Sequence, residues 1–165
     1  MMSGSSCRAV LEQIQQHFMS LLDAETCRLY IHTASLKGAY EDGRFDSCNR
    51  SILTEGRSVA HVFKNRKTLK HLIVSSDMND KLKQSIDPVR LTQIQSYLAI
   101  PLIVNGRIVA VAELFNLRRH SHLIENLLQE TWENPFIVFC GVVARVVESV
   151  QEYCSTTQVP GLQTQ

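Results

Sequence analysis

The stretch from Ser96 to Asn116, SYLAIPLIVNGRIVAVAELFN, constrains the fold more than any other part of the chain. Two apolar runs rich in β-branched and aromatic residues flank the dipeptide Asn105-Gly106. Such runs fit a pleated, half-buried surface, and Asn-Gly readily takes the positive φ angles of a type I′ turn. The stretch therefore predicts an antiparallel hairpin. Pro101 has no backbone N–H, so we expect it at a bulge or a strand edge.

Hydrophobic periodicity predicts further elements on both sides of this hairpin. Helical spacing covers residues 6–24, 58–64, 123–128 and 135–154, and strand-like patterns cover 25–33, 50–54 and 69–74. Residues 34–49 show no period and predict a loop, and 75–95 predict a long loop with one or two helical turns. We expect an α+β fold: a central antiparallel sheet with the N- and C-terminal helices on one face and a ligand-type pocket on the other.

Composition is that of an ordinary globular protein. Its 165 residues fit a single domain, expected over 6–154, with residues 1–5 as a tag or disordered segment and 155–165 as a disordered tail. A net charge of +1 gives no indication of nucleic-acid or membrane binding, and no apolar run is long enough for a membrane span. Five widely spaced cysteines without a CxxC pair indicate reduced thiols in a cytoplasmic protein.

Several segments together resemble the GAF domain, the small sensor module of cyclic nucleotide phosphodiesterases and many signalling proteins. Residues 23–30 are similar to the family's first strand, 59–62 to the start of a short helix, and 99–102 with 105–106 and 109–116 to its hairpin. The last helix, with Phe139-Cys140-Gly141-Val142, is most similar to the phosphodiesterase branch. The resemblance extends to about Tyr153. It implies a non-catalytic regulatory module of a larger signalling protein, with a cyclic nucleotide phosphodiesterase as the candidate parent.

The resemblance also implies a ligand-binding set of residues. Phe45 would stack on a purine base with Asp46 beside it, and the free N–H groups of the helix start at Ser58 would face a phosphate. Asp87 and Glu113 match acidic residues that read the base edge or line the pocket. The full candidate set is Arg28, Phe45, Asp46, Ser58, Val59, Asp87, Arg90 and Glu113.

Other positions depart from the pattern of nucleotide-binding relatives. Arg28 stands where a small hydroxyl residue is usual, and Lys83 and Arg90 stand where an aromatic residue and a threonine are expected. Arg57 and Ala60 replace two glycines at the helix start, which makes close approach of the backbone to a phosphate harder. Standard nucleotide binding is therefore in question although the fold is retained.

Two classes of function stay open. One is a sensing module that binds a small molecule, with cyclic AMP or cyclic GMP as candidate allosteric ligand, and couples it to output through the terminal helices. The other is a dimerisation or protein-interaction module with a degenerate, self-filled pocket. We expect no resident cofactor, catalytic residue or metal. A homodimer through the first and last helices is expected, because residues 136–150 carry more apolar surface than one side of a sheet requires.

Glu113 gives the sharpest expectation about the pocket. Its neighbours on the same strand face are apolar, and an unpaired charge in such a place is costly. Arg28, Lys83 and Arg90 are the candidate cations, with Arg28 and Arg90 favoured. A pair of this kind would occupy the space that a purine base takes in nucleotide-binding relatives.

Overall fold

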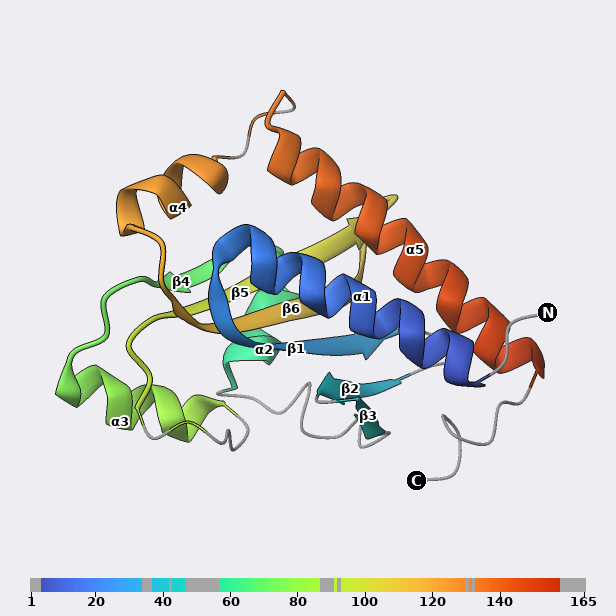
Figure 1. The fold of residues 1–165 in the computed structure, drawn as a ribbon, viewed down its shortest axis with the longest axis horizontal. Helices are drawn as coiled ribbons and strands as arrows, with labels where there is room; N and C mark the ends of the chain where they lie inside the picture. Colours follow the sequence, from blue (N-terminus) through green and yellow to red (C-terminus); the bar gives the residue numbers. More distant parts are fainter. Residues whose placement is uncertain are drawn as a thin grey trace.

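The computed structural model describes residues 4–33, 37–41, 43–46, 57–86, 91, 93–129, 131 and 133–157, without the side chains of 4–7, 44, 46 and 150–157. In these residues six strands form one antiparallel sheet in the order β3-β2-β1-β6-β5-β4 (Figure 1). The strands are β1 (Ala24–His32), β2 (Lys37–Glu41), β3 (Arg44–Asp46), β4 (Leu69–His71), β5 (Tyr97–Val104) and β6 (Arg107–Leu117). The helices are α1 (Gly4–Leu22), α2 (Ser58–Asn65), α3 (Ser76–Ser85), α4 (Ser121–Leu127) and α5 (Pro135–Thr157).

The predicted hairpin forms the middle of the sheet as β5 and β6. Asn105 and Gly106 both have positive φ, at 49° and 77°, as the two-residue turn requires. Pro101 lies beyond Ala99, where the pairing of β5 with β4 ends, so its missing N–H falls on a stretch of β5 with an open side. A register shift follows one residue later in the strand. Of the two alternatives expected for Pro101, a bulge or a strand edge, the described pairing favours the strand edge, since the register shift lies between Leu102 and Ile103.

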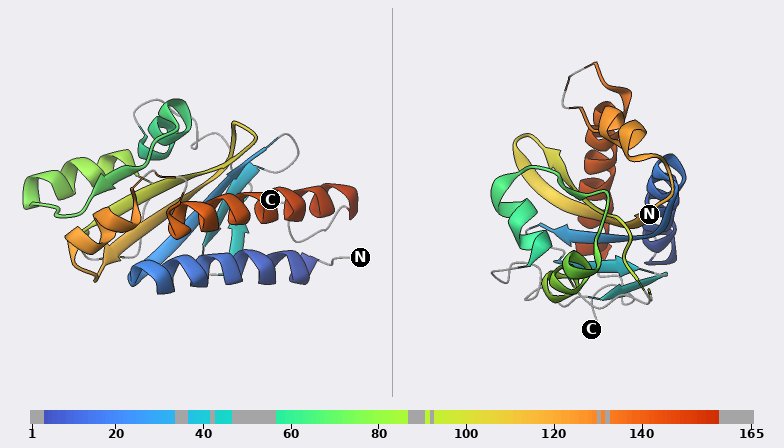
Figure 2. Two further views of the ribbon diagram at one scale, coloured as in Figure 1. Left: turned by 90° about the horizontal axis from the view of Figure 1, so that it is seen from above. Right: turned by 90° about the vertical axis from the view of Figure 1, so that its left-hand side faces the viewer.

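Helices cover both faces of the sheet (Figure 2). α1 and α5 lie side by side on one face, where the ring of Phe18 packs 5.3 Å from that of Phe139. α2 and α3 lie on the other face, packed on a separate apolar cluster that includes Val62 and Phe115. We call these the α1/α5 face and the α2/α3 face. The expected arrangement of terminal helices on one face is confirmed.

The prediction of a loop over 34–49 was wrong in part, because Lys37–Glu41 and Arg44–Asp46 are the strands β2 and β3. Gly38 weakens β2 as an isolated strand, but β1 supplies its hydrogen-bonding partner. Tyr40 of β2 is fully buried in the apolar cluster of the α1/α5 face. Gly43, directly before β3, has a φ of 74°. The predicted strand over 50–54 lies outside the described residues.

The connection before the hairpin is more regular than expected. α3 is ten residues long, and its N-cap Ser75 accepts a hydrogen bond from the backbone N–H of Met78. Leu82, Ile86 and Ile94 are buried on the α2/α3 face, as their apolar character indicated. Among the described helices, none combines the length and the apolar character that a bilayer crossing requires.

Gly141 occupies the interior of α5, and a Cβ atom there would meet no atom of the described chain within 4 Å. Glycine destabilises a helix interior by about 1 kcal/mol relative to alanine. We expect Gly141→Ala to raise the free energy of unfolding by about 0.5–1 kcal/mol, measured by urea denaturation. Ala144→Gly, in the same helix, is the reverse control and should lower it. A less stable Gly141→Ala variant would mean that this space is already filled.

Candidate functional site

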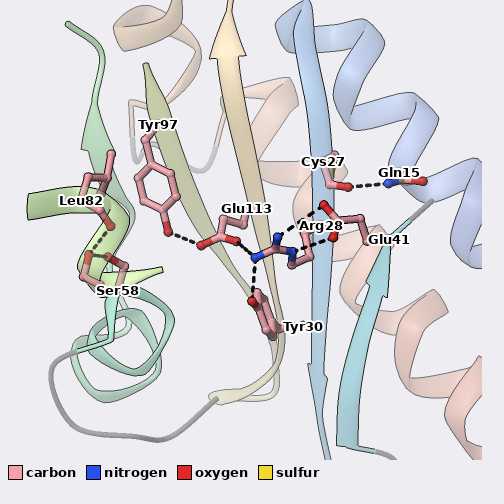
Figure 3. A network of polar contacts seen from close by, with 10 residues as sticks. Gln15, Cys27, Arg28, Tyr30, Glu41, Ser58, Leu82, Tyr97 and Glu113 are labelled. Carbon is pink, nitrogen blue, oxygen red and sulfur yellow. Dashed lines mark hydrogen bonds and ion pairs between the residues drawn. The ribbon is translucent and has the colours of Figure 1, made fainter. Parts of the chain in front are cut away.

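A row of polar side chains crosses the α2/α3 face over four neighbouring strands (Figure 3). Its members are Glu41 of β2, Arg28 and Tyr30 of β1, Glu113 of β6 and Tyr97 of β5, and we call this set the polar ladder. The register of β1 and β6 places Arg28 directly opposite Glu113. Arg28 and Tyr30 share a strand face because side chains alternate along a strand.

The guanidinium of Arg28 bridges two carboxylates. Its Nη1 donates to Glu113 Oε1 at 3.1 Å and to the hydroxyl of Tyr30 at 3.0 Å. Its Nε and Nη2 donate to the two carboxylate oxygens of Glu41 at 3.2 and 3.4 Å. The hydroxyl of Tyr97 donates to Glu113 Oε2 at 2.5 Å. Each oxygen of the Glu113 carboxylate therefore accepts a hydrogen bond from a different side chain.

The centre of the polar ladder is buried and one end reaches solvent. The side chains of Arg28 and Glu113 are 3% and 0% exposed, whereas that of Glu41 is 30% exposed. Burial by itself lowers the pKa of Arg28, but Glu113, Tyr30 and Glu41 outweigh it and raise that pKa above its usual value. Burial and the charge of Glu113 raise the pKa of Tyr97 well above its usual value. Arg28 is therefore a permanent cation and Tyr97 a neutral hydrogen-bond donor.

Aromatic rings enclose the cation. The Cζ atom of Arg28 lies 5.8 Å from the ring centroids of both Tyr30 and Phe115. At this distance the ring faces attract a desolvated cation. Ala99 lies opposite Glu113 on the other side of β6, so β5 offers a small side chain next to the carboxylate. The ion pair is therefore surrounded by aromatic and small apolar side chains.

The start of α2 packs over this region. Ser58 and Val59 are both buried, and Val59 belongs to the apolar cluster of the α2/α3 face. The hydroxyls of Ser58 and Ser85 lie 2.8 Å apart, and that of Ser85 donates to the carbonyl of Leu82 at 3.0 Å. These bonds join α2 to the end of α3. The role of the Ser58 and Val59 N–H groups as phosphate donors stays a prediction.

Of the candidate residues, the structure brings Arg28 and Glu113 into contact. The predicted partnership of Glu113 with one of three cations is thereby confirmed, and Arg28 is the partner. Phe45 needs a correction, because it is buried among the apolar residues of the α1/α5 face, together with Tyr40 opposite it on β2. On that face its ring cannot stack on a ligand held beside Glu113. The side chain of Asp46 and all of Asp87 and Arg90 lie outside the described residues.

Comparison with known families supplies the identification. The family model described as the GAF domain matches residues 6–131. The chain belongs to the GAF domain family. No curated protein sequence matches this GAF domain.

Solved structures share the fold of this GAF domain at low sequence identity. A methyl-accepting chemotaxis protein (residues 122 to 287) has 12% identity and a TM-score of 0.56, with 90% of this chain and 91% of that chain covered. The type II free methionine-R-sulfoxide reductase of Thermoplasma acidophilum has 11% identity and a TM-score of 0.54, with 87% and 94% covered. The GAF domain of the Acinetobacter phosphoenolpyruvate-protein phosphotransferase has 12% identity and a TM-score of 0.52, with 90% and 91% covered. GAF domains thus occur in signalling proteins and in enzymes, and these likenesses establish the fold alone.

Two cysteines of this GAF domain have described side chains, and both are free and buried. Burial, followed by the charges of Glu113 and Glu41, raises the pKa of the Cys27 thiol far above its usual value. Burial raises the pKa of the Cys140 thiol to about 12. Since the thiolate is the nucleophile, neither residue is equipped for covalent chemistry at neutral pH.

We expect iodoacetamide at pH 8 to leave Cys27 and Cys140 unmodified in the native protein. Peptide mass spectrometry after digestion resolves each cysteine separately. The control is the same treatment in guanidinium chloride, where all five cysteines should react. Rapid modification of either residue in the native protein would contradict the burial argument and would favour a redox role.

Three members of the polar ladder were missed from the sequence: Tyr30, Glu41 and Tyr97. Tyr30 could have been found, because its spacing from Arg28 already placed both on one strand face. Glu41 could not be found, because the sequence predicts a loop rather than the strand β2 for its segment. Tyr97 was counted with the apolar run of its strand, although a buried tyrosine hydroxyl usually needs a partner.

Asn116 also has a role that its position in the sequence does not reveal. It has a φ of 56° at the end of β6. Its Oδ1 accepts from the N–H of Gln95 at 2.7 Å, and its Nδ2 donates to the carbonyl of Gln93 at 3.1 Å and to Glu25 at 3.2 Å. The side chain therefore fixes the segment that leads into Tyr97. In the described part of the chain, no three His, Cys, Asp or Glu side chains form a metal-binding group.

Proposed function

We propose that this GAF domain is a non-catalytic regulatory module that acts through protein contacts, with the polar ladder in the place where nucleotide-binding relatives hold their ligand. The observation that carries this proposal is the buried contact between Arg28 and Glu113. Glu113 is the acidic residue that the family resemblance assigns to the pocket wall, and Arg28 replaces a small hydroxyl residue. The guanidinium of Arg28 already donates the hydrogen bond to Glu113 that a ligand beside it would otherwise donate.

A purine base would have to compete with this internal pair. Both carboxylate oxygens of Glu113 already accept hydrogen bonds, one from Arg28 and one from Tyr97. Separating a buried ion pair leaves an uncompensated charge, which is strongly unfavourable. A neutral amino group of a base offers less to the carboxylate than the guanidinium it would displace. The geometry therefore favours the self-filled alternative over cyclic nucleotide sensing.

The exposed side of α5 supports a role in protein contacts. Val138, Val142 and Val146 recur every fourth residue along this helix and are 54%, 55% and 37% exposed. Residues with this spacing form one stripe on a helix surface. The outward side of α1 carries Glu12, Gln13 and other polar residues instead. We propose a homodimer in which the valine stripe of α5 meets its copy, with α1 at the margin of the interface.

Thermal unfolding with cyclic AMP or cyclic GMP tests the proposal. We expect no rise in melting temperature at millimolar nucleotide. A ligand at 100 times its dissociation constant would stabilise the domain by about 2.7 kcal/mol, which is a shift of several degrees for a chain of this size. A saturable rise with either nucleotide would overturn the self-filled interpretation and support the sensing class.

The proposal also covers the parent protein and its location in the cell. The candidate parent protein is a cyclic nucleotide phosphodiesterase or a related signalling protein, supported by the resemblance of residues 139–142 in the last helix. A cytoplasmic location is supported by the free thiols of Cys27 and Cys140, since oxidising compartments favour disulfides. Cloning of the parent transcript and fractionation of cells expressing it test both.

A further inference from the structure

A groove of about 390 Å³ opens at the sheet edge where β4 separates from β5. In the described residues β4 pairs with β5 no further than Ala99, and Thr68 lines the groove together with Ile100 and Ile103. The first turns of α5 close its base. No member of the polar ladder lines this groove, so it is distinct from the site described above.

The floor of the groove is apolar and contains an unusual open space. Ile100, Pro101 and Ile103 of β5 and Ile137 of α5 line it. Gly141 also lines the groove, and a Cβ atom there would meet no atom of the described residues within 4 Å. Glycine is unfavourable in a helix interior, and in this case no close packing requires it. The absence of a side chain at Gly141 leaves open space in the groove.

Among the described residues, the polar side chains that line the groove are those of Arg66, Thr68 and Thr131. Arg66 ends α2 in the left-handed conformation, with a φ of 59°, and its side chain is exposed. Arg66 has no ion-pair partner in the part of the chain that the structure describes. Thr68 and Thr131 supply the hydroxyls. A guanidinium with neighbouring hydroxyls suits a carboxylate, which it can bind in bidentate fashion.

We propose that this groove binds a small amphipathic carboxylate, with its aliphatic body on the β5–α5 floor and its carboxylate at Arg66. A concave site that combines apolar side chains with a few polar groups is the usual form of a small-molecule site, and 390 Å³ lies at the lower end of the usual size range. An added peptide strand fits less well, because Pro101 offers no N–H for pairing. The inference does not depend on the function proposed for the polar ladder.

Isothermal titration of the full chain with octanoate tests this proposal. We expect one saturable site for octanoate, none for acetate, which lacks the aliphatic body, and at least about tenfold weaker binding of 1-octanol, which lacks the charge. Absence of saturable octanoate binding would overturn the proposal. Equal affinity for octanoate and 1-octanol would also overturn it, because the carboxylate would then have no partner.

Two substitutions locate the site. Arg66→Asn removes the cation but tolerates the left-handed backbone, and it should weaken octanoate binding at least about tenfold. Gly141→Leu fills the floor and should abolish binding. The controls are Lys67→Gln, an exposed neighbour that does not line the groove, and Gly141→Ala, which changes the helix but adds one methyl group. Both controls should bind within about threefold of the native protein, whereas native-like binding by Gly141→Leu and Arg66→Asn would place octanoate elsewhere.

Discussion

Arg28→Met is expected to lower the free energy of unfolding by about 3–5 kcal/mol, because it removes the cation that compensates the fully buried carboxylate of Glu113. The methionine side chain retains most of the apolar volume, so lost packing contributes little. Glu41 is partly exposed and can turn to water, whereas Glu113 cannot. Urea denaturation monitored by circular dichroism measures the change.

A double-mutant cycle separates the ion pair from general packing. Arg28→Met combined with Glu113→Leu should lose less stability than the sum of the two single changes, with a coupling energy of about 1–3 kcal/mol. Strict additivity would contradict the pairing. The matched control is Arg107→Met, which breaks the pair with Glu148 at 2.6 Å on the surface, where Arg107 is 62% exposed. That change should cost at most about 1 kcal/mol.

Val142→Glu is expected to convert a dimer into a monomer. The residue lies in the middle of the exposed valine stripe of α5 and is 55% exposed in the single chain. In a two-fold interface each substitution occurs twice, so two carboxylates would be buried near each other without a cation. Val146→Glu, one turn further along, should have the same effect. Light scattering coupled to size-exclusion chromatography measures the mass.

Ile73→Glu is the control for this experiment. Ile73 is an exposed apolar residue as well, at 83%, but it lies between β4 and α3 rather than on α5. This variant should keep the mass and the melting temperature of the native protein. A native protein that is monomeric at high micromolar concentration would refute the homodimer, and a Val142→Glu variant that remains dimeric would move the interface away from α5.

The hairpin was predictable from a local rule, and the ion pair from the cost of leaving a charge unpaired on an apolar strand face. Asn105-Gly106 specifies its turn without help from the rest of the chain. Glu113 lies on an apolar strand face, so a buried cation was required, and Arg28 was a candidate on the neighbouring strand. The two terminal helices follow from the same kind of argument, because each has a continuous apolar side.

The error over β2 and β3 has a different origin. These strands are short, and their stability depends on pairing of β2 with β1 and of β3 with β2, which no local propensity shows. Asp42-Gly43 was the available signal, since this dipeptide favours a two-residue hairpin turn. The prediction that Phe45 stacks on a ligand was wrong for the same reason, because it did not place Phe45 in the strand β3. A side chain's face depends on strand register, and a shift of one residue reverses it.

The ion pair between Arg28 and Glu113 also makes these two positions interdependent for protein engineering. Replacing Arg28 alone by a small residue leaves a buried carboxylate without its cation, and this takes away a large part of the roughly 5–15 kcal/mol that typically separates folded from unfolded protein. A variant designed to open space beside Glu113 therefore has to change both positions together, with a neutral residue in place of Glu113.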